Sequence, residues 1–308
     1  MTPSRTYSDP DAIARIADLT LRSRRLAEGA ISGQHRSPFL GFNIEFASYR
    51  EYSPGEDLRR LDWRVFARSD RHYIKQYEQE SNVRVTFVVD ASASMAYKGA
   101  RAALSKFDYA ATLVVSLALL LVRQQDPVGL VLFDEKATET LPPNATQAQI
   151  VAMTAQLERC APSRTTDLGG LLRSLAGQLK RRSVVVVVSD LFTDPDGLYD
   201  SLNRLRFQGH EALILQILDR DELDLPFDGP TIFKDIEGDE ELFAEPWAFR
   251  REYRKAMEDF LENTRRECGQ RGYDHVRFVT DEPLADALSV FLHARLDADR
   301  AARQAGRS

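Results

Sequence analysis

The stretch RVTFVVDASAS, residues 84–94, decides the fold of this 308-residue chain. A run of apolar, mostly β-branched residues stops at Asp90, and Ser92 and Ser94 follow at alternate positions. An apolar run without polar alternation is typical of a parallel strand that is buried on both faces. The polar residues after it then lie at the carboxyl end of the strand, which is where open α/β sheets bind ligands.

Similar apolar runs recur along the chain, in PVGLVLFD (127–134), SVVVVVSD (183–190) and EALILQILD (211–219). Helical patterns separate these runs, and a weaker alternation in EKATETLP (135–142) indicates an edge strand. The predicted helices span residues 101–124, 146–159, 167–181 and 197–208. Strands that alternate with helices form βαβ units. We therefore predict an α/β fold with a doubly wound, mostly parallel sheet and helices on both faces.

The regions on either side of this core have different patterns. Residues 1–82 contain one amphipathic helical pattern, at about 10–29, and we predict an N-terminal extension that packs on the core at 83–220. Residues 221–308 are predicted to complete the fold. They are expected to form a hairpin at 228–243, a long helix at 246–271 ended by Gly272, a strand at 274–280 and a last helix at 283–296.

Composition excludes several functional classes. The net charge of −6 gives no reason to expect general nucleic-acid binding. In residues 50–75, arginines and acidic residues are interleaved, so internal ion pairing or a protein-binding surface is favoured there. Cys160 and Cys268 lie far apart without CxxC spacing, which argues against structural zinc and a disulfide framework. The apolar segment 109–122 is too short to span a membrane, and no secretory signal is present. We expect a cytoplasmic protein without a membrane span.

Polar residues at the ends of two predicted strands form a candidate metal site. Asp90 and Asp190 each end an apolar run, and Thr166 lies in the loop sequence SRTTDLGGLL (163–172). If the two strands are neighbours, these loops converge, and their carboxylates and hydroxyls suit Mg²⁺, or else Mn²⁺ or Ca²⁺. An open coordination position would accept a carboxylate from another molecule. The alternative is that Ser92 and Ser94 cap the following helix and that Asp190 is a helix N-cap.

DASAS, TTDLGGLL and VVVVSDLF together resemble the metal-ion-dependent adhesion site of von Willebrand factor A domains. The resemblance implies five metal ligands, Asp90, Ser92, Ser94, Thr166 and Asp190. In that family the third loop usually continues with glycine after its aspartate. Leu191 stands there in this chain, so we expect the backbone of that loop to differ.

The segment EFASYREYSPGEDLRRLDWRVFARSDRHYIKQYEQE (45–80) resembles the signature of the domain of unknown function 58 family. Glu56 stands where that family more often has aspartate. The resemblance implies an adaptor for a MoxR-type AAA+ ATPase, and through it for a client protein. No P-loop and no GxSxG motif is present, so we expect a non-enzymatic interaction module. The alternatives are a metal-dependent phosphoryl hydrolase that uses the same Asp/Ser cluster, and a scaffold with a degenerate metal site.

Overall fold

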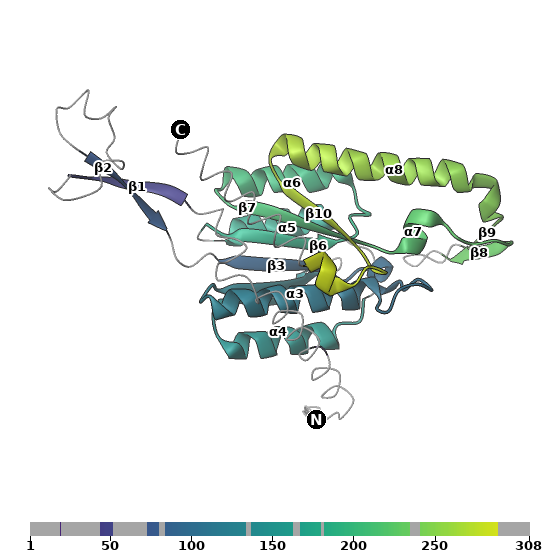
Figure 1. Cartoon of the computed structure of the whole chain (residues 1–308), viewed down its shortest axis with the longest axis horizontal. Coiled ribbons are helices and arrows are strands. Elements are labelled where there is room, and N and C mark those ends of the chain that lie inside the picture. Colours follow the sequence, from purple (N-terminus) through teal and green to yellow (C-terminus); the bar gives the residue numbers. More distant parts are fainter. Residues whose placement is uncertain are drawn as a thin grey trace.

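The computed structural model describes residues 84–133, 137–162, 167–179, 182–234 and 241–288, with Leu19 and the backbone of 44–51 and 73–79. Its centre is a six-stranded sheet of order β10–β7–β6–β3–β4–β5 (Figure 1). The strands are β3 (Val85–Asp90), β4 (Val128–Phe133), β5 (Ala137–Asn144), β6 (Val184–Ser189), β7 (Glu211–Leu218) and β10 (Asp274–Val279). All neighbours pair in parallel except β5, which is antiparallel to β4 at the edge. The predicted α/β sheet and its edge strand are confirmed.

The sheet reverses its winding direction at β3. The chain passes from β3 to β4 on one side, and later places β6 on the other side of β3. In the register, Val89 pairs with Val188, so the carboxyl ends of β3 and β6 lie beside each other. This is the topological switch point of a doubly wound sheet, where crossovers in opposite directions leave a crevice for a ligand.

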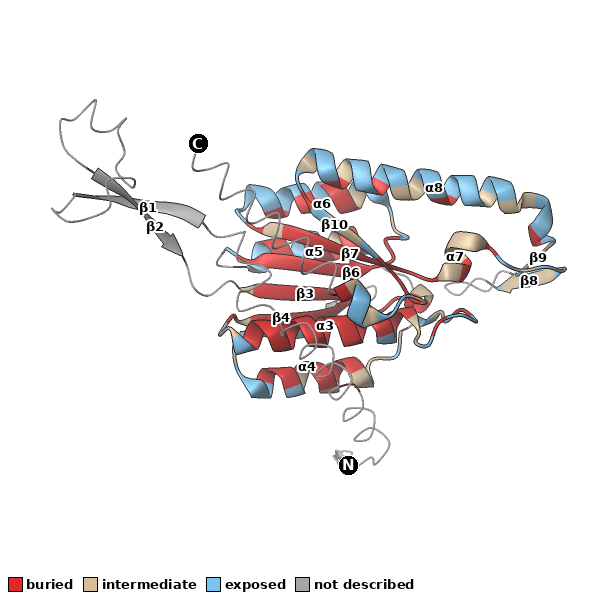
Figure 2. Ribbon diagram, viewed as in Figure 1, coloured by how far each residue is buried: buried red, intermediate tan, exposed pale blue. Residues whose placement is uncertain are grey.

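Helices cover both faces of the sheet because successive strand residues point to opposite sides. On one face, Phe87 and Val89 pack in a cluster with α3 (Lys106–Arg123) and α4 (Gln147–Arg159). On the other, Val88 and Val187 pack in a cluster with α5 (Leu168–Gln178) and α6 (Pro195–Phe207). Figure 2 shows the central strands buried between these layers.

The segment 109–122 lies inside α3 and is buried throughout, as predicted for a core helix. Among the residues that the structure describes, no helix combines the length and apolar character needed to cross a membrane. Three helix ends differ from the prediction by two residues or more. Helix α3 begins at Lys106, not at 101, because Ser105 caps it by accepting from the amide of Asp108. Helix α6 begins at Pro195, two residues early, because Asp194 caps it, and α5 ends at Gln178.

The C-terminal region contains the predicted hairpin, of β8 (Thr231–Lys234) and β9 (Glu241–Ala244), and the predicted long helix α8 (Pro246–Arg271). Helix α8 ends at Gly272, whose φ of 71° is a left-handed conformation that favours glycine. The described part of the expected last helix, 284–288, is helical, and the rest lies outside the described residues. The short helix α7 (Arg220–Asp224) was not predicted, since one turn has no readable periodicity.

The described part of the N-terminal region contains a strand pair for which we made no prediction. β1 (Ile44–Glu51) and β2 (Tyr73–Gln79) form an antiparallel pair that the mixed charged and aromatic sequence did not reveal. Of the expected helix at 10–29, only Leu19 is described, and it is helical and buried. The arginine-rich segment 52–72 lies outside the described residues. The division at 82 and 220 stays a prediction, and β10 extends the central sheet from beyond 220.

The close packing of α5 on α6 depends on Gly169. A Cβ at this position would lie 2.8 Å from the backbone carbonyl carbon and oxygen of Gly197. We expect Gly169→Ala to lower the free energy of unfolding by about 1–3 kcal/mol, because the two backbones must separate. Gly177→Ala is the matched control, since its Cβ would meet nothing within 4 Å. The control should be neutral or stabilising in chemical denaturation, and equal losses in both variants would contradict this account.

Candidate functional site

Asp90 is the last residue of β3, and its carboxylate is held on both sides. Only 2% of the residue is exposed. Its Oδ1 accepts from the amide of Ser92 at 2.9 Å, and its Oδ2 accepts from Ser189 Oγ at 2.6 Å. Burial, and then the negative charge of Asp190, raise the pKa of Asp90 to about 6. A carboxylate with a raised pKa at a sheet switch point is a candidate functional group.

The two serines connect Asp90's loop to Asp190. The hydroxyl oxygens of Ser92 and Ser94 lie 3.0 Å apart, and Ser94 Oγ donates to Asp190 Oδ2 at 2.7 Å. Since Ser94 uses its one proton for Asp190, Ser92 is the donor to Ser94. The structure therefore brings together four of the five predicted site residues. Thr166 lies outside the described residues, and its neighbour Asp167 is the N-cap of α5.

The capping alternative fails for both features that it was meant to explain. Ser92 precedes η3 (Ala93–Ala96), a 3₁₀ turn, but makes no side-chain cap hydrogen bond to it. Helix α6 is capped by Asp194, and Asp190 Oδ1 instead accepts from the amide of Phe192 at 3.0 Å. Ser94 lies inside η3 and donates to Asp190 Oδ2, so none of the three residues is explained by capping a helix.

Leu191 adopts a φ of +65°, in the left-handed region that favours glycine. The loop after β6 thus turns at a residue for which this conformation costs about 1–2 kcal/mol. Its side chain is buried in the cluster between the sheet, α5 and α6, and its amide donates to Ser189 Oγ at 3.0 Å. Packing and this hydrogen bond hold Leu191 in a conformation that glycine would adopt freely.

Lys106 and Glu222 complete the cluster, and neither was recognised in the sequence. Lys106 Nζ lies 2.8 Å from Asp190 Oδ2 and also forms an ion pair with Glu222. Burial alone would lower the pKa of Lys106, but the charges of Asp190 and Glu222 together raise it, so the ammonium stays charged. A usable signal was present: Glu222 follows β7 closely, at the same sheet edge as Asp90 and Asp190.

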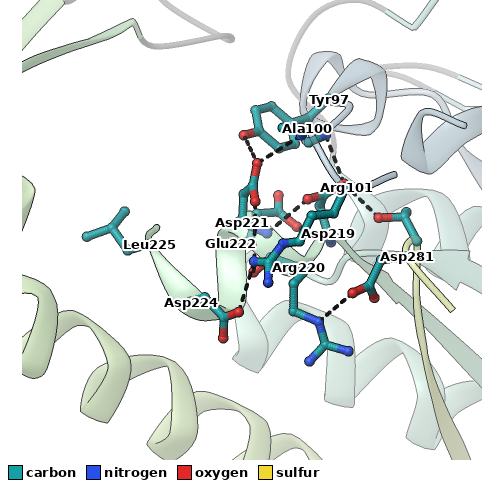
Figure 3. A network of polar contacts seen from close by, with 12 residues as sticks. Tyr97, Ala100, Arg101, Asp219, Arg220, Asp221, Glu222, Asp224, Leu225 and Asp281 are labelled. Carbon is teal, nitrogen blue, oxygen red and sulfur yellow. Dashed lines mark hydrogen bonds and ion pairs between the residues drawn. The ribbon is translucent and has the colours of Figure 1, made fainter. Parts of the chain in front are cut away.

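A second network ties this edge of the sheet to α7 (Figure 3). Asp219, which is 1% exposed, accepts from the amide of Gly99 at 3.0 Å and from Thr280 Oγ1 at 2.6 Å. Asp221 Oδ2 accepts from the amide of Ala100 at 3.2 Å and from the hydroxyl of Tyr97 at 3.3 Å. The loop that carries Ser92 and Ser94 is therefore fixed at its far end by α7.

The donor set of the first cluster fits a hard divalent cation. Ligands of an octahedral Mg²⁺ at about 2.1 Å lie about 3 Å from their neighbours. The oxygens of Ser92, Ser94 and Asp190 have successive separations of 3.0 and 2.7 Å. In the described part of the chain, no three His, Cys, Asp or Glu side chains gather to hold a metal. An ion here would be held by two carboxylates and by hydroxyls.

The same geometry is unfavourable for Asp90 as a nucleophile. A nucleophilic carboxylate needs an oxygen that can reach the substrate. Each oxygen of Asp90 accepts one hydrogen bond and keeps a second lone pair that a small ion could use, but the residue is almost entirely buried, which is unfavourable for attack on a bulky phosphate ester. Asp90 is better placed to orient the serine loop, and to supply charge, than to attack a phosphate ester.

A doubly wound sheet with Asp-x-Ser-x-Ser on the first loop, and an aspartate on a neighbouring loop of its switch point, defines a von Willebrand A-like domain. The chain belongs to the family described as "Protein of unknown function DUF58", whose profile matches residues 48–263.

Among similar proteins, "Uncharacterized protein Rv1480" of Mycobacterium tuberculosis is 26% identical over 232 residues, which cover 74% of this chain and 72% of that protein. "Uncharacterized protein Mb1516" of Mycobacterium bovis matches equally. Among solved structures, the conserved hypothetical protein BatB from Bacteroides thetaiotaomicron is 17% identical with a TM-score of 0.47, over 70% of this chain and 100% of that one. The SpRpn10 VWA domain is 12% identical with a TM-score of 0.41, over 69% and 95%.

Proposed function

We propose that this protein is an interaction module that binds a divalent cation, Mg²⁺ in the first place, at the switch point of its sheet. Asp90, Ser92, Ser94 and Asp190 would hold the ion together with Thr166. The observation that supports this most directly is the continuous chain of oxygens from Ser92 through Ser94 to Asp190. A site that combines two carboxylates with neutral hydroxyls leaves the ion able to accept a further anionic ligand.

A carboxylate of a partner protein supplies that ligand. Metal and partner then bind cooperatively, since each provides part of the other's site, and the coupling is reciprocal. The family resemblance suggests a MoxR-type AAA+ ATPase as the partner, with this protein as the adaptor that presents a client to it. Residues beside the site would then decide which acidic partner fits.

The test is binding of the full chain to its cognate MoxR-type ATPase. We expect Asp90→Ala and Ser92→Ala to weaken association by about tenfold or more, and EDTA to weaken it similarly in the wild type, because an ion-bridged contact loses its bridge. Ser174→Ala on the exposed side of α5 is the matched control and should bind as the wild type does. Undiminished binding in EDTA and in both site variants would reject the metal bridge.

The hydrolase alternative makes a different prediction. It requires Mg²⁺-dependent turnover of a phosphate ester, lost in Asp90→Ala, and a panel of phosphatase substrates measures this directly. The enclosed position of Asp90 places this alternative second. Turnover that follows Asp90 would reverse the order.

A further inference from the structure

A fully buried ammonium group lies beside the candidate metal site. Lys106 is the first residue of α3, and its side chain is 0% exposed. Its Nζ contacts Asp190 and Glu222, and it lies 5.3 Å from the centre of the Phe192 ring. Phe192 in turn packs against Phe260 of α8, with ring centres 5.5 Å apart, so the ring over the lysine is itself held by α8. A charge removed from water in this way needs fixed partners, and Lys106 has them.

The ammonium binds the same oxygen that the serine chain reaches. Asp190 Oδ2 accepts from Ser94 Oγ at 2.7 Å and from Lys106 Nζ at 2.8 Å. The oxygen of Asp190 nearest the predicted ligands therefore already has a cationic partner. Any divalent ion at the serines must share Asp190 with an ammonium, and the two cations repel each other where the dielectric is low.

Glu222 holds Lys106 in this position. Glu222 is the third residue of α7, and its Oε2 accepts from the amide of Asp219 at 2.8 Å in a capping box. The hydroxyl of Tyr253 on α8 donates to the backbone carbonyl of Glu222 at 2.7 Å. Because Glu222 is fixed at both its side chain and its backbone, it holds the ammonium of Lys106 in one position.

We propose that Lys106 is a built-in cation of the site, which holds Asp190 in place without a metal and keeps the affinity for the divalent ion low. This inference rests on the proposed function and adds a way in which the protein itself limits metal binding. A site that is partly neutralised by its own lysine retains Mg²⁺ weakly by itself. The acidic side chain of a partner offsets the repulsion between the two cations, so tight metal binding occurs only in the complex.

The experiment is calorimetric titration of the full chain with Mg²⁺, together with the melting temperature in EDTA and in Mg²⁺. We expect Lys106→Met to bind Mg²⁺ about tenfold or more tightly than the wild type, because one nearby positive charge is gone. Its melting temperature should fall in EDTA, where Asp190 and Glu222 lose their partner, and should rise more steeply with Mg²⁺ than that of the wild type. Lys234→Met is the matched control, since Lys234 is an exposed lysine paired with Glu241.

A second variant keeps the test decisive if Lys106→Met does not fold. Lys106→Met with Glu222→Gln removes one charge of each sign, so the net charge of the cluster stays that of the wild type. Because Lys106 contacts Asp190 directly, we still expect tighter Mg²⁺ binding than in the wild type. Equal or weaker binding in every Lys106 variant that folds would overturn the role of Lys106 and leave the metal site standing. An absence of Mg²⁺ binding in the wild type and in every variant would instead overturn the proposed function.

Discussion

In EDTA at pH 7.5, Asp90→Asn should melt at a higher temperature than the wild type. Burial and Asp190 raise the pKa of Asp90 from 3.8 to about 6, so at pH 7.5 the folded protein carries a carboxylate that its surroundings disfavour. At about 1.4 kcal/mol per pKa unit, the neutral amide should gain about 2–3 kcal/mol, or roughly 5 °C. Saturating Mg²⁺ should stabilise the wild type but not Asp90→Asn, and so narrow or reverse the difference.

The pH dependence of this difference follows from the direction of the shift. A carboxyl whose pKa is raised on folding binds its proton more tightly in the folded state. Its stabilising contribution is complete below pH 3.8 and is lost as the pH rises through about 6. The advantage of Asp90→Asn should therefore be full at pH 7.5 and vanish near pH 4. Mg²⁺ binding to the wild type should weaken as the pH falls through 6, because the proton competes with the ion.

Asp194→Asn is the matched control for this substitution. Asp194 is the exposed N-cap of α6 and accepts from the amide of Gly197 at 2.8 Å. Asparagine caps helices about as well as aspartate, so this variant should melt close to the wild type in EDTA and in Mg²⁺. Asp90→Asn could instead melt at a lower temperature than the wild type in EDTA at pH 7.5. The hydrogen bonds to the Asp90 carboxylate would then stabilise the fold by more than the burial of its charge destabilises it.

The sequence was sufficient for the part of the site that depends on the sheet. Uninterrupted apolar runs predict buried parallel strands, and parallel strands bring their carboxyl ends to one edge. Asp90 and Asp190 could therefore be placed at one edge of the sheet, and the neighbouring positions of β3 and β6 then bring them together. Ser92 and Ser94 followed from their spacing after Asp90. The prolines of β5, Pro142 and Pro143, fit its position as an edge strand, because proline donates no ladder hydrogen bond.

Glu222 could be found from its place shortly after β7, but Lys106 had no comparable signal in the sequence. A single lysine at the start of an apolar helix has no periodicity, and its partner depends on which loop folds over it. Glu222 belongs to α7, a helix of five residues that is held by Tyr253 of α8 and, through its N-cap Asp219, by Thr280. The sequence marked Leu191 as a departure from the family pattern, but it did not reveal the left-handed backbone there, because leucine rarely adopts it. Tertiary packing rather than local pattern determines all three features.

Asp219→Ala should cause the largest loss of stability among these substitutions, because Asp219 joins three separate segments. Its Oδ2 accepts from the amide of Gly99 and from Thr280 Oγ1, and its Oδ1 accepts from the amide of Asp221 at 2.9 Å. Removal of the Asp219 carboxylate leaves buried donors without partners. We therefore expect the free energy of unfolding, measured by chemical denaturation, to fall by about 3–5 kcal/mol. Asp224→Ala is the control, since Asp224 is 35% exposed and pairs with Arg101 at the surface. It should cost less than about 1 kcal/mol.

Gly99→Ala tests the same connection from the other side. A Cβ on Gly99 would lie 2.1 Å from Asp219 Oδ1 and 2.7 Å from Asp221 Oδ2, so the loop must move away from α7. Because this loop continues from Ser92 and Ser94, both Gly99→Ala and Asp219→Ala should weaken Mg²⁺ binding although neither residue is a predicted ligand. If both variants lose stability but bind Mg²⁺ like the wild type, α7 stabilises the fold and does not affect the geometry of the metal site. If both also lose Mg²⁺ affinity, the position of α7 helps to set the geometry of the serine loop.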